Sequence, residues 1–200
     1  MDIYLLDRNK EITDAWEEAF IPLADYENNL FIVNDTLNDF LTNHPNIDGI
    51  VSPANSFGIM DGGYDKAIIN IFGDELQKKV REILYWEFGG YQTPGTCFPI
   101  PIDRSTILLH TPTMRYPEEI ADNRIIFDCM YNTIRTAMIN NCKAIVIPAF
   151  GGCTGGVEPE TIAKYMRLGY EYALYREILS NWDEVRTMRS NFYKADGRSI

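Results

Sequence analysis

The chain has 200 residues, 46% of them hydrophobic, and a formal net charge of −11 at pH 7. The length suits one domain, residues 1–200, with a substantial core, and the charge excludes nonspecific nucleic-acid binding, which needs a basic surface. Apolar runs fall short of the roughly 20 residues of a membrane span, and the N-terminal residues lack the basic start of a secretory signal. We therefore expect a soluble, cytoplasmic protein that associates with no membrane.

Apolar runs and helical spacing alternate along the whole chain. In chain order they predict strands over residues 3–6, 30–33, 47–51, 94–101, 106–109 and 144–147, and helices over 11–20, 37–41, 64–73, 75–88, 119–140 and 159–178. Asn9 is a predicted N-cap, Pro22 ends the first helix, and Gly89-Gly90 ends the fourth. Residues after about 178 are polar and weakly periodic, so we expect a short closing helix with a frayed tail. Strands alternating with helices indicate an α/β domain.

Polar or glycine-rich loops follow four of the predicted strands. In open α/β sheets, ligands bind in the crevice beyond the carboxyl ends of the strands, so these loops are the candidate site. Two of the loops are rich in glycine, and a helix follows each of them, an arrangement that offers backbone N–H groups to a phosphate. Neither matches a P-loop or the Gly-x-Gly-x-x-Gly fingerprint. The four loops are residues 34–36, 52–63, 110–113 and 148–156.

The first glycine loop carries a family resemblance. Val51-Ser52-Pro53-Ala54-Asn55-Ser56, followed by Asp61-Gly62-Gly63-Tyr64-Asp65-Lys66-Ala67-Ile68, resembles the signature of macrodomains, the ADP-ribose-binding modules. Their pattern is Val-Asn-Ala-Ala-Asn, a glycine-rich turn, and Val-Asp-x-Ala-Ile. This chain departs from it at Ser52, Pro53 and Asp61, where Asn, Ala and Gly are usual.

Two further loops extend the resemblance to roughly residues 30–164. Val33-Asn34-Asp35-Thr36 is similar to the family's Gly-Asp-Ile-Thr element, in which the Asp accepts a hydrogen bond from the adenine amino group. Ile147-Pro148-Ala149-Phe150-Gly151 through Gly156 resembles the second phosphate loop of the family. The resemblance implies a three-layer α/β/α fold with a mixed, mostly parallel sheet, and it covers neither 111–117 nor the residues after 178.

The resemblance implies an ADP-ribose ligand, no cofactor and no metal, and it leaves two classes of function open. In hydrolytic macrodomains an Asn at the position of Asn55 orients the distal ribose, and an Asp at that of Asp65 positions or activates water; the acid/base His of some members is Ile69 here. We expect a hydrolase of an ADP-ribosyl linkage on a protein, an acetyl group or a phosphate. The alternatives are a noncatalytic reader, which binds ADP-ribosylated protein, and a binder of another NAD-derived nucleotide. The ligand-binding residues implied are Asp35, Thr36, Ala54, Asn55, Gly62, Gly63, Tyr64, Phe150, Gly151, Gly152, Cys153, Thr154 and Gly155.

Several of these residues have simpler interpretations. Asp35 is also placed as a helix N-cap, Asn55 as a turn residue in the left-handed region, and Asp65 as a favourable carboxylate at a helix start. Cys153 between glycines could be a nucleophile with His110 as its base. Phe150 and Phe57 are candidates by position to cover the adenine or the distal ribose. The four scattered cysteines and two histidines lack zinc-cluster spacing.

Overall fold

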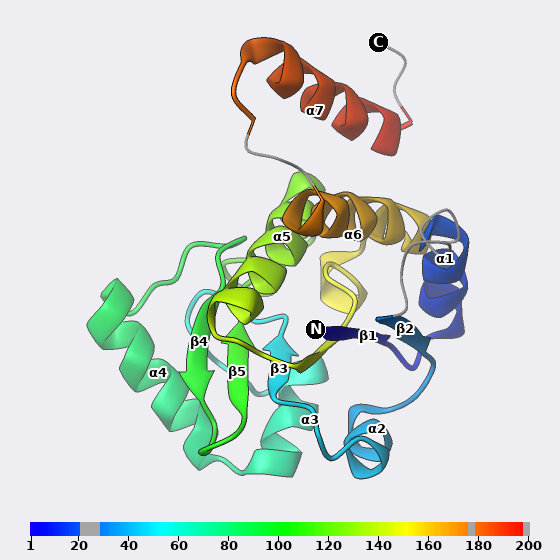
Figure 1. Ribbon diagram of the computed structural model, residues 1–200. Helices are drawn as coiled ribbons and strands as arrows, with labels where there is room; N and C mark the ends of the chain where they lie inside the picture. The colour runs from blue at the N-terminus through cyan, green and yellow to red at the C-terminus, as the bar shows by residue number, and fades with distance from the viewer. Residues whose placement is uncertain (21–28, 176–178, 198–200) are drawn as a thin grey trace.

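The computed structural model describes residues 1–20, 29–175 and 179–197. Its strands alternate with helices, as the sequence predicts (Figure 1). The strands are β1 (Asp2–Leu6), β2 (Leu30–Val33), β3 (Gly49–Ser52), β4 (Phe98–Pro101), β5 (Ile107–His110) and β6 (Ala144–Ile147). The α-helices are α1 (Lys10–Phe20), α2 (Leu37–Asn43), α3 (Gly63–Phe72), α4 (Glu75–Phe88), α5 (Arg124–Ile139), α6 (Pro159–Leu174) and α7 (Trp182–Ala195), and a 3₁₀ turn spans Cys153–Gly155.

The strands form a six-stranded sheet in the order β2-β1-β6-β3-β5-β4. Every pairing is parallel except that of β4 with β5, which is antiparallel. The register pairs Leu5 with Ile147 across β1 and β6, and Ser52 with His110 across β3 and β5. Because the carboxyl ends of parallel strands meet at one edge, five loops emerge along the same rim of the sheet. The predicted mixed, mostly parallel sheet is confirmed.

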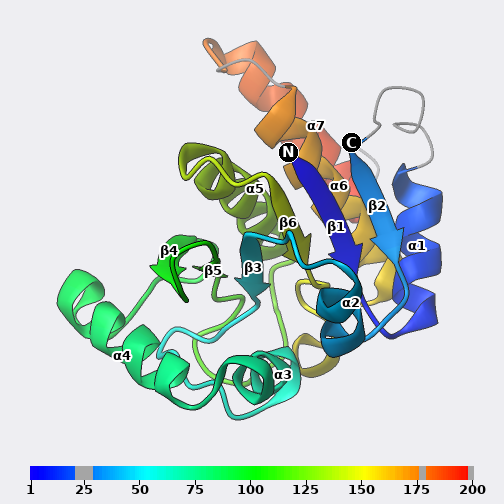
Figure 2. The same cartoon turned by 60° about the horizontal axis from the view of Figure 1, so that its bottom comes forward.

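Alternating side chains place the two halves of the core on opposite faces of the sheet, because successive residues of a strand point to opposite sides. In β1, Ile3 and Leu5 pack with α1, α5 and α6, whereas Leu6 packs with α2, α3 and α4. Figure 2 shows these two helical layers flanking the sheet, with α7 beyond α5 and α6. Among the described helices none has the length and apolarity needed to cross a membrane.

The start of α5 differs from the prediction because the segment before it forms a hydrogen bond with the backbone of a distant loop. Helix α5 was predicted to begin near Glu119 but begins at Arg124, because the Ile120 N–H donates to the carbonyl of Gly155 at 2.9 Å and keeps that segment extended over the second glycine loop. The strand expected over 94–101 spans only the last four of those positions. Helix α4 has the predicted bounds, and Gly89 caps it in the left-handed region at φ 63°. Pro22 and the predicted helix end at Ile178 lie outside the described residues.

Gly169 allows the close approach of α6 to α5. A Cβ at this position would lie 2.8 Å from both Met130 Cβ and the Phe127 carbonyl oxygen. Gly169→Ala should therefore lower the free energy of unfolding by about 1–3 kcal/mol through overpacking, despite the roughly 1 kcal/mol that alanine gains over glycine in a helix. Urea denaturation measures the change. Gly62→Ala is the matched control, because no described atom lies within 4 Å of its added Cβ; equal stability of the two variants would contradict this packing.

Candidate functional site

The loops that the sequence predicts to form the site lie along one rim, at the carboxyl ends of the parallel strands. Asp7 follows β1, residues 34–36 follow β2, 53–62 follow β3, 111–117 follow β5, and 148–156 follow β6. The tertiary structure thus brings together segments more than 100 residues apart in the chain. Asp7 was not among the predicted site residues, because it follows a strand that carries no motif.

Asn55 shapes the first glycine loop. Its Oδ1 accepts hydrogen bonds from the N–H groups of Phe57 and Ile59 at 3.1 and 3.3 Å, and its Nδ2 donates to the Ile59 carbonyl at 2.7 Å. This is the turn role considered from the sequence, although Asn55 is not among the described residues with positive φ. In this structure the amide therefore holds the 55–59 turn, which leaves Phe57 and Ile59 exposed.

The segment after β5 supports the same loop from the side. Asn55 forms a parallel bridge with Met114, and the Ser56 N–H donates to the Met114 carbonyl at 3.1 Å. Gln92 closes the arrangement: its N–H donates to the Ser56 carbonyl, and its Oε1 lies 2.7 Å from His110 Nδ1. The 111–117 loop, which no motif covered, is thus part of the scaffold of the site.

Asp65 is a buried carboxyl in the first turn of α3. It is 7% exposed, and the Ser52 hydroxyl donates to its Oδ1 at 2.7 Å. Burial raises the pKa of Asp65 to about 7; the Ser52 hydrogen bond opposes this rise, and the Asp61 carboxylate adds to it. The departure from the family pattern at Ser52 therefore has a structural role: this residue holds the carboxyl that the resemblance makes catalytic.

Tyr64 and Asp7 are two further titratable residues of the rim segments: Tyr64 lies in the first turn of α3, and Asp7 follows β1. The Tyr64 ring packs with the core on the α2–α4 side, and its buried hydroxyl has no hydrogen-bond partner among the described residues. Burial, together with the charges of Asp7 and Asp65, raises the pKa of Tyr64 above its ordinary range. Burial likewise raises the pKa of Asp7, while the backbone N–H groups of Asn9, which donates to Oδ1 of Asp7 at 2.8 Å, and of Ala149 oppose this rise.

The second glycine loop is held tightly against the 114–120 segment. Gly151 has φ 88°, and a Cβ there would lie 3.1 Å from the Ile120 and Ile126 side chains. Gly155 is equally close to Ile120, at 3.0 Å. Phe150 is fully buried in the core, so its ring cannot stack on a ligand as the sequence suggested, and only its backbone faces the loop. Gly152, by contrast, meets no described atom closer than 3.8 Å with an added Cβ.

Asp35 and Thr36 precede α2, and the sequence suggested Asp35 as its N-cap. Thr36 is the N-cap of α2, and its hydroxyl accepts from the Asp39 N–H. Asp35 is partly exposed, and its Oδ1 accepts from the Thr36 N–H at 2.7 Å. The helix cap is therefore Thr36, and the N-cap interpretation of Asp35 is wrong. Ala54, also in the predicted ligand set, is buried with 2% exposure.

The Cys153–His110 pair has no support in the geometry. Cys153 is exposed at φ 49°, whereas His110 is fully buried, with Nδ1 beside Gln92 and Nε2 lacking a partner among the described residues. Burial lowers the pKa of His110 to about 3, so the ring is neutral. A ring that reaches no solvent does not serve as base to an exposed thiol. Thr154 is exposed beside Cys153.

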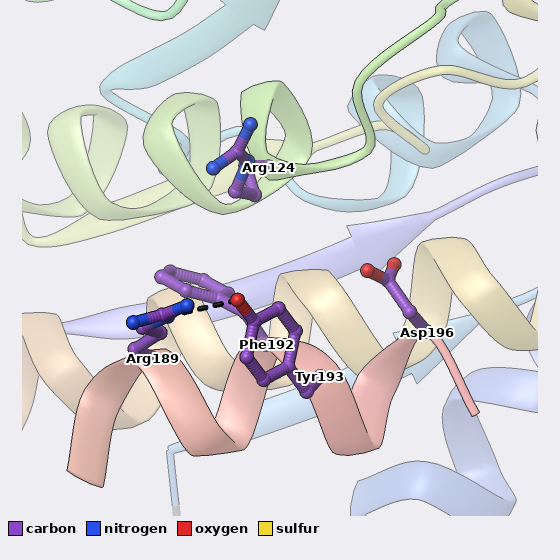
Figure 3. Close-up of a pocket in the computed structure, with 5 residues that line it drawn as sticks. All are labelled: Arg124, Arg189, Phe192, Tyr193 and Asp196. Carbon is purple, nitrogen blue, oxygen red and sulfur yellow. Dashed lines mark hydrogen bonds between the residues drawn. The ribbon is translucent and has the colours of Figure 1, made fainter. Parts of the chain in front are cut away.

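Two hollows lie on the α7 side of the molecule, apart from the rim residues. One, of about 250 Å³, is lined by Arg124 at the start of α5 and by Arg189, Phe192, Tyr193 and Asp196 from the α7 region, and the Arg189 Nε donates to the Tyr193 hydroxyl at 2.8 Å (Figure 3). The other, of about 560 Å³, lies between α1, α6 and α7. Neither includes a residue of the predicted ligand set.

Sequence reasoning missed three contributors to the site. Ser52 was recorded as a departure from a pattern rather than as the partner of a carboxyl thirteen positions away. Asp7 had no motif, although a carboxylate directly after a buried strand is a signal that could have found it. Ile120 was assigned to a helix, because its apolar spacing fits α5; its contact with the second glycine loop depends on tertiary structure.

The mixed, mostly parallel sheet carries two glycine loops and the start of α3, which has no side-chain cap among the described residues, along one rim, and open α/β sheets bind ligands at such a rim. A comparison with known families matches residues 51–166 to the Macro domain. The chain therefore belongs to the macrodomain family, whose members bind ADP-ribose and related compounds. The predicted family and fold class are confirmed.

Solved structures with the same fold include the macrodomain of Mycobacterium tuberculosis DarG, which is 16% identical with a TM-score of 0.54 and matches 63% of this chain and 82% of its own. An Oceanobacillus iheyensis macrodomain with ADP is 18% identical with a TM-score of 0.54, over 76% of this chain and 86% of its own. An uncharacterized protein of Aquifex aeolicus is 26% identical over 129 residues, which are 60% of this chain and 70% of that protein.

Burial of Asp65 makes stability depend on pH. The folded carboxyl titrates near 7 and the ordinary value is 3.8, so between these values the folded state holds a proton that the unfolded state lacks, and stability falls as the pH rises. Asp65→Asn should remove this pH dependence, which lowers the free energy of unfolding by about 3 kcal/mol between pH 5 and pH 8. Urea denaturation of both proteins at the two pH values measures it. His110 acts in the opposite direction in both proteins and cancels in the difference; parallel pH dependences would contradict the assignment.

Proposed function

We propose that this chain binds ADP-ribose across the rim between its two glycine loops. The observation that carries the proposal is the start of α3: Gly62 is its N-cap, without a side-chain cap among the described residues, and Gly62 and Gly63 are exposed with open space around them. Free N–H groups and the helix dipole at such a start favour a phosphate. Membership of the macrodomain family and the likeness to a macrodomain with ADP support the choice of ligand.

The net charge of −11 does not oppose this ligand class. Backbone N–H groups bind phosphate without lysine, and charges beyond roughly 8–10 Å are screened at physiological salt. Burial raises the pKa of Asp65 to about 7, which lowers the negative charge that a phosphate would meet beside the start of α3. The remaining proposed ligand contacts are Asp35 and Thr36 at the adenine end and the backbone of residues 150–155 at the diphosphate.

Calorimetric titration with ADP-ribose should give micromolar or tighter binding, with much weaker binding of AMP or ATP. Asp35→Ala should weaken ADP-ribose binding roughly 10- to 100-fold, since a hydrogen bond to a charged group contributes about 1.5–3 kcal/mol. Asp103→Ala is the matched control: Asp103 also accepts backbone N–H bonds in a turn, from Ser105 and Thr106, but at the opposite edge of the sheet. Equal losses in both variants would contradict adenine recognition, and tighter binding of NAD would favour another NAD-derived nucleotide.

We further infer that the site hydrolyses an ADP-ribosyl linkage, with Asp65 as general base. A base works best when its pKa lies near the operating pH, and burial gives Asp65 a pKa of about 7. The Ser52 hydroxyl fixes one carboxyl oxygen, while Oδ2 takes no part in that bond and is the oxygen we assign to water. Asn55 acts in this scheme by holding the turn beside the distal ribose. A noncatalytic reader is the alternative. The low exposure of Asp65, 7%, favours this alternative because it limits the access of water to the carboxyl.

Asp65→Ala should reduce turnover by about 10²–10⁴, the usual contribution of a positioned base, while ADP-ribose binding changes far less. The assay is release of ADP-ribose from mono-ADP-ribosylated protein, O-acetyl-ADP-ribose or ADP-ribose 1″-phosphate. Activity should rise with pH through about 7, because the base must be ionised. If the wild type binds ADP-ribose but turns over none of these substrates, the reader interpretation holds.

Ser52→Ala removes the hydroxyl that donates a hydrogen bond to the proposed base, Asp65. The Ser52 hydrogen bond lowers the pKa of Asp65, so its loss should move the rising limb of the pH–rate profile to higher pH while the plateau is largely kept. Asp103→Ala should leave the profile in place. An unshifted limb in Ser52→Ala would exclude Asp65 as the titrating base.

A further inference from the structure

The first glycine loop holds two large apolar side chains out in solvent. Phe57 and Ile59 are each 42% exposed, and Gly58 between them is buried. Gly58 has φ 64°, and a Cβ there would lie 2.7 Å from Val80 Cγ1 and 2.9 Å from Leu84 Cδ1 of α4. The backbone at Gly58 is therefore packed directly against α4, and the apolar side chains on either side of it stay exposed.

Polar contacts, rather than burial of these apolar side chains, hold the turn in place. The Asn55 amide bonds the N–H groups of Phe57 and Ile59 and the Ile59 carbonyl, and the Gly58 N–H donates to the Asn55 carbonyl at 3.3 Å. Apolar side chains on a turn that is already ordered bind a partner at a low cost in conformational entropy. Exposed apolar residues that lie together mark interaction sites.

Two aromatic residues extend this exposed surface. The Tyr91 ring lies edge-on to the Phe57 ring, with 5.7 Å between their centroids. Tyr116 is 58% exposed and directly follows Arg115, whose carbonyl accepts a hydrogen bond from the Ser56 N–H at 3.2 Å. The four residues that we call the turn surface are Phe57, Ile59, Tyr91 and Tyr116.

The exposed charges of the two loops that carry the turn surface are mostly acidic. Asp61, Glu118 and Glu119 are exposed there, against Arg115 as the exposed basic residue, and the whole chain has a net charge of −11. Charge complementarity therefore favours a basic partner and disfavours an acidic one. A polypeptide that presents apolar side chains with basic residues beside them has the chemistry that fits this surface.

The turn surface lies where the proposed function puts the distal end of the ligand. Ile59 is three residues before Gly62, the N-cap of α3, and Asn55, which holds the turn, is assigned to the side of the distal ribose. An ADP-ribosyl group is attached to a protein through its distal ribose. The modified polypeptide would therefore leave the site beside this turn.

We propose that the turn surface binds the polypeptide that carries the ADP-ribosyl group, and that it selects apolar residues flanked by basic ones next to the modified residue. This inference rests on the proposed function and narrows its substrate class to ADP-ribosylated protein, because an acetyl or phosphate group offers no side chain to the turn surface. It concerns binding, so it applies to a hydrolase and to a reader alike.

Peptide conjugates of ADP-ribose test the proposal. The probe is ADP-ribose joined through a hydrolysis-resistant linkage to a short peptide, with leucines beside the linked residue and lysines beyond them. Free ADP-ribose and the same conjugate with serines in place of the leucines are the comparisons. In calorimetric titration the wild type should bind the leucine conjugate roughly 10-fold tighter than either comparison, the effect expected of a central apolar anchor.

Phe57→Ser and Ile59→Ser should each remove most of this difference, while the Kd for free ADP-ribose changes far less. Both variants should keep the melting temperature of the wild type, because the side chains are exposed and the Asn55 amide still holds the turn. Ile139→Ser is the matched control for Ile59→Ser. Ile139 is also exposed, but it ends α5 at the opposite edge of the sheet, shortly before β6 begins, so its replacement should change none of the three Kd values.

Four results would overturn the inference. Equal affinity of the wild type for the three ligands would mean that the turn surface takes no polypeptide. A loss for free ADP-ribose as large as that for the leucine conjugate would place Phe57 or Ile59 on the nucleotide itself. An equal loss in Ile139→Ser would mean unspecific apolar attraction. Self-association of the wild type in sedimentation, abolished by Ile59→Ser, would assign the surface to a second copy of the chain.

Failure of the proposed function gives a different result. In that case the wild type binds neither free ADP-ribose nor the serine conjugate, whereas failure of this inference alone leaves both bound with equal affinity to the leucine conjugate.

Discussion

Parallel pairing of β1, β6, β3 and β5 is the constraint on which the site depends. The register places the ends of these strands side by side, so Asp7, Ser52, Thr111 and Pro148 emerge at one edge. Both faces of the strands are covered by helices, and apolar side chains on alternating sides supply the burial that keeps the pairing in register. A slip of one residue would turn Ser52 away from α3 and expose apolar residues of β3 to the wrong face.

Several polar side chains near the rim are buried in an otherwise apolar core. Asp65 is buried and accepts a hydrogen bond from the Ser52 hydroxyl, the Tyr64 hydroxyl lacks a partner among the described residues, and His110 is buried as a neutral ring. Each arrangement costs stability. Such costs concentrate where a protein prepares polar groups for a ligand, and perturbed pKa values cluster at the same places. Asp65, Tyr64 and His110 lie at the carboxyl ends of β3 and β5 and the start of α3, whereas Trp16 Nε1, which also lacks a partner among the described residues, lies in α1.

Glycine backbone geometry shapes both loops of the rim, because Gly63 and Gly151 adopt positive φ. Their glycines allow the open loop before α3 and the close approach of Ile120 to Gly151 and Gly155, and burial raises the pKa of Asp65 beside that open loop to about 7.

The sequence by itself determined the alternation of strands and helices, the buried strands and the two glycine loops, because apolar periodicity and turn residues act over short distances. Helix α4 has its predicted bounds for that reason. The tertiary structure decided which side chains meet: Ser52 with Asp65, and Ile120 with the second glycine loop. It also decided that Phe150 is core and that Asn55 holds its own turn. These contacts join residues whose proximity depends on strand order and register, which local patterns do not encode.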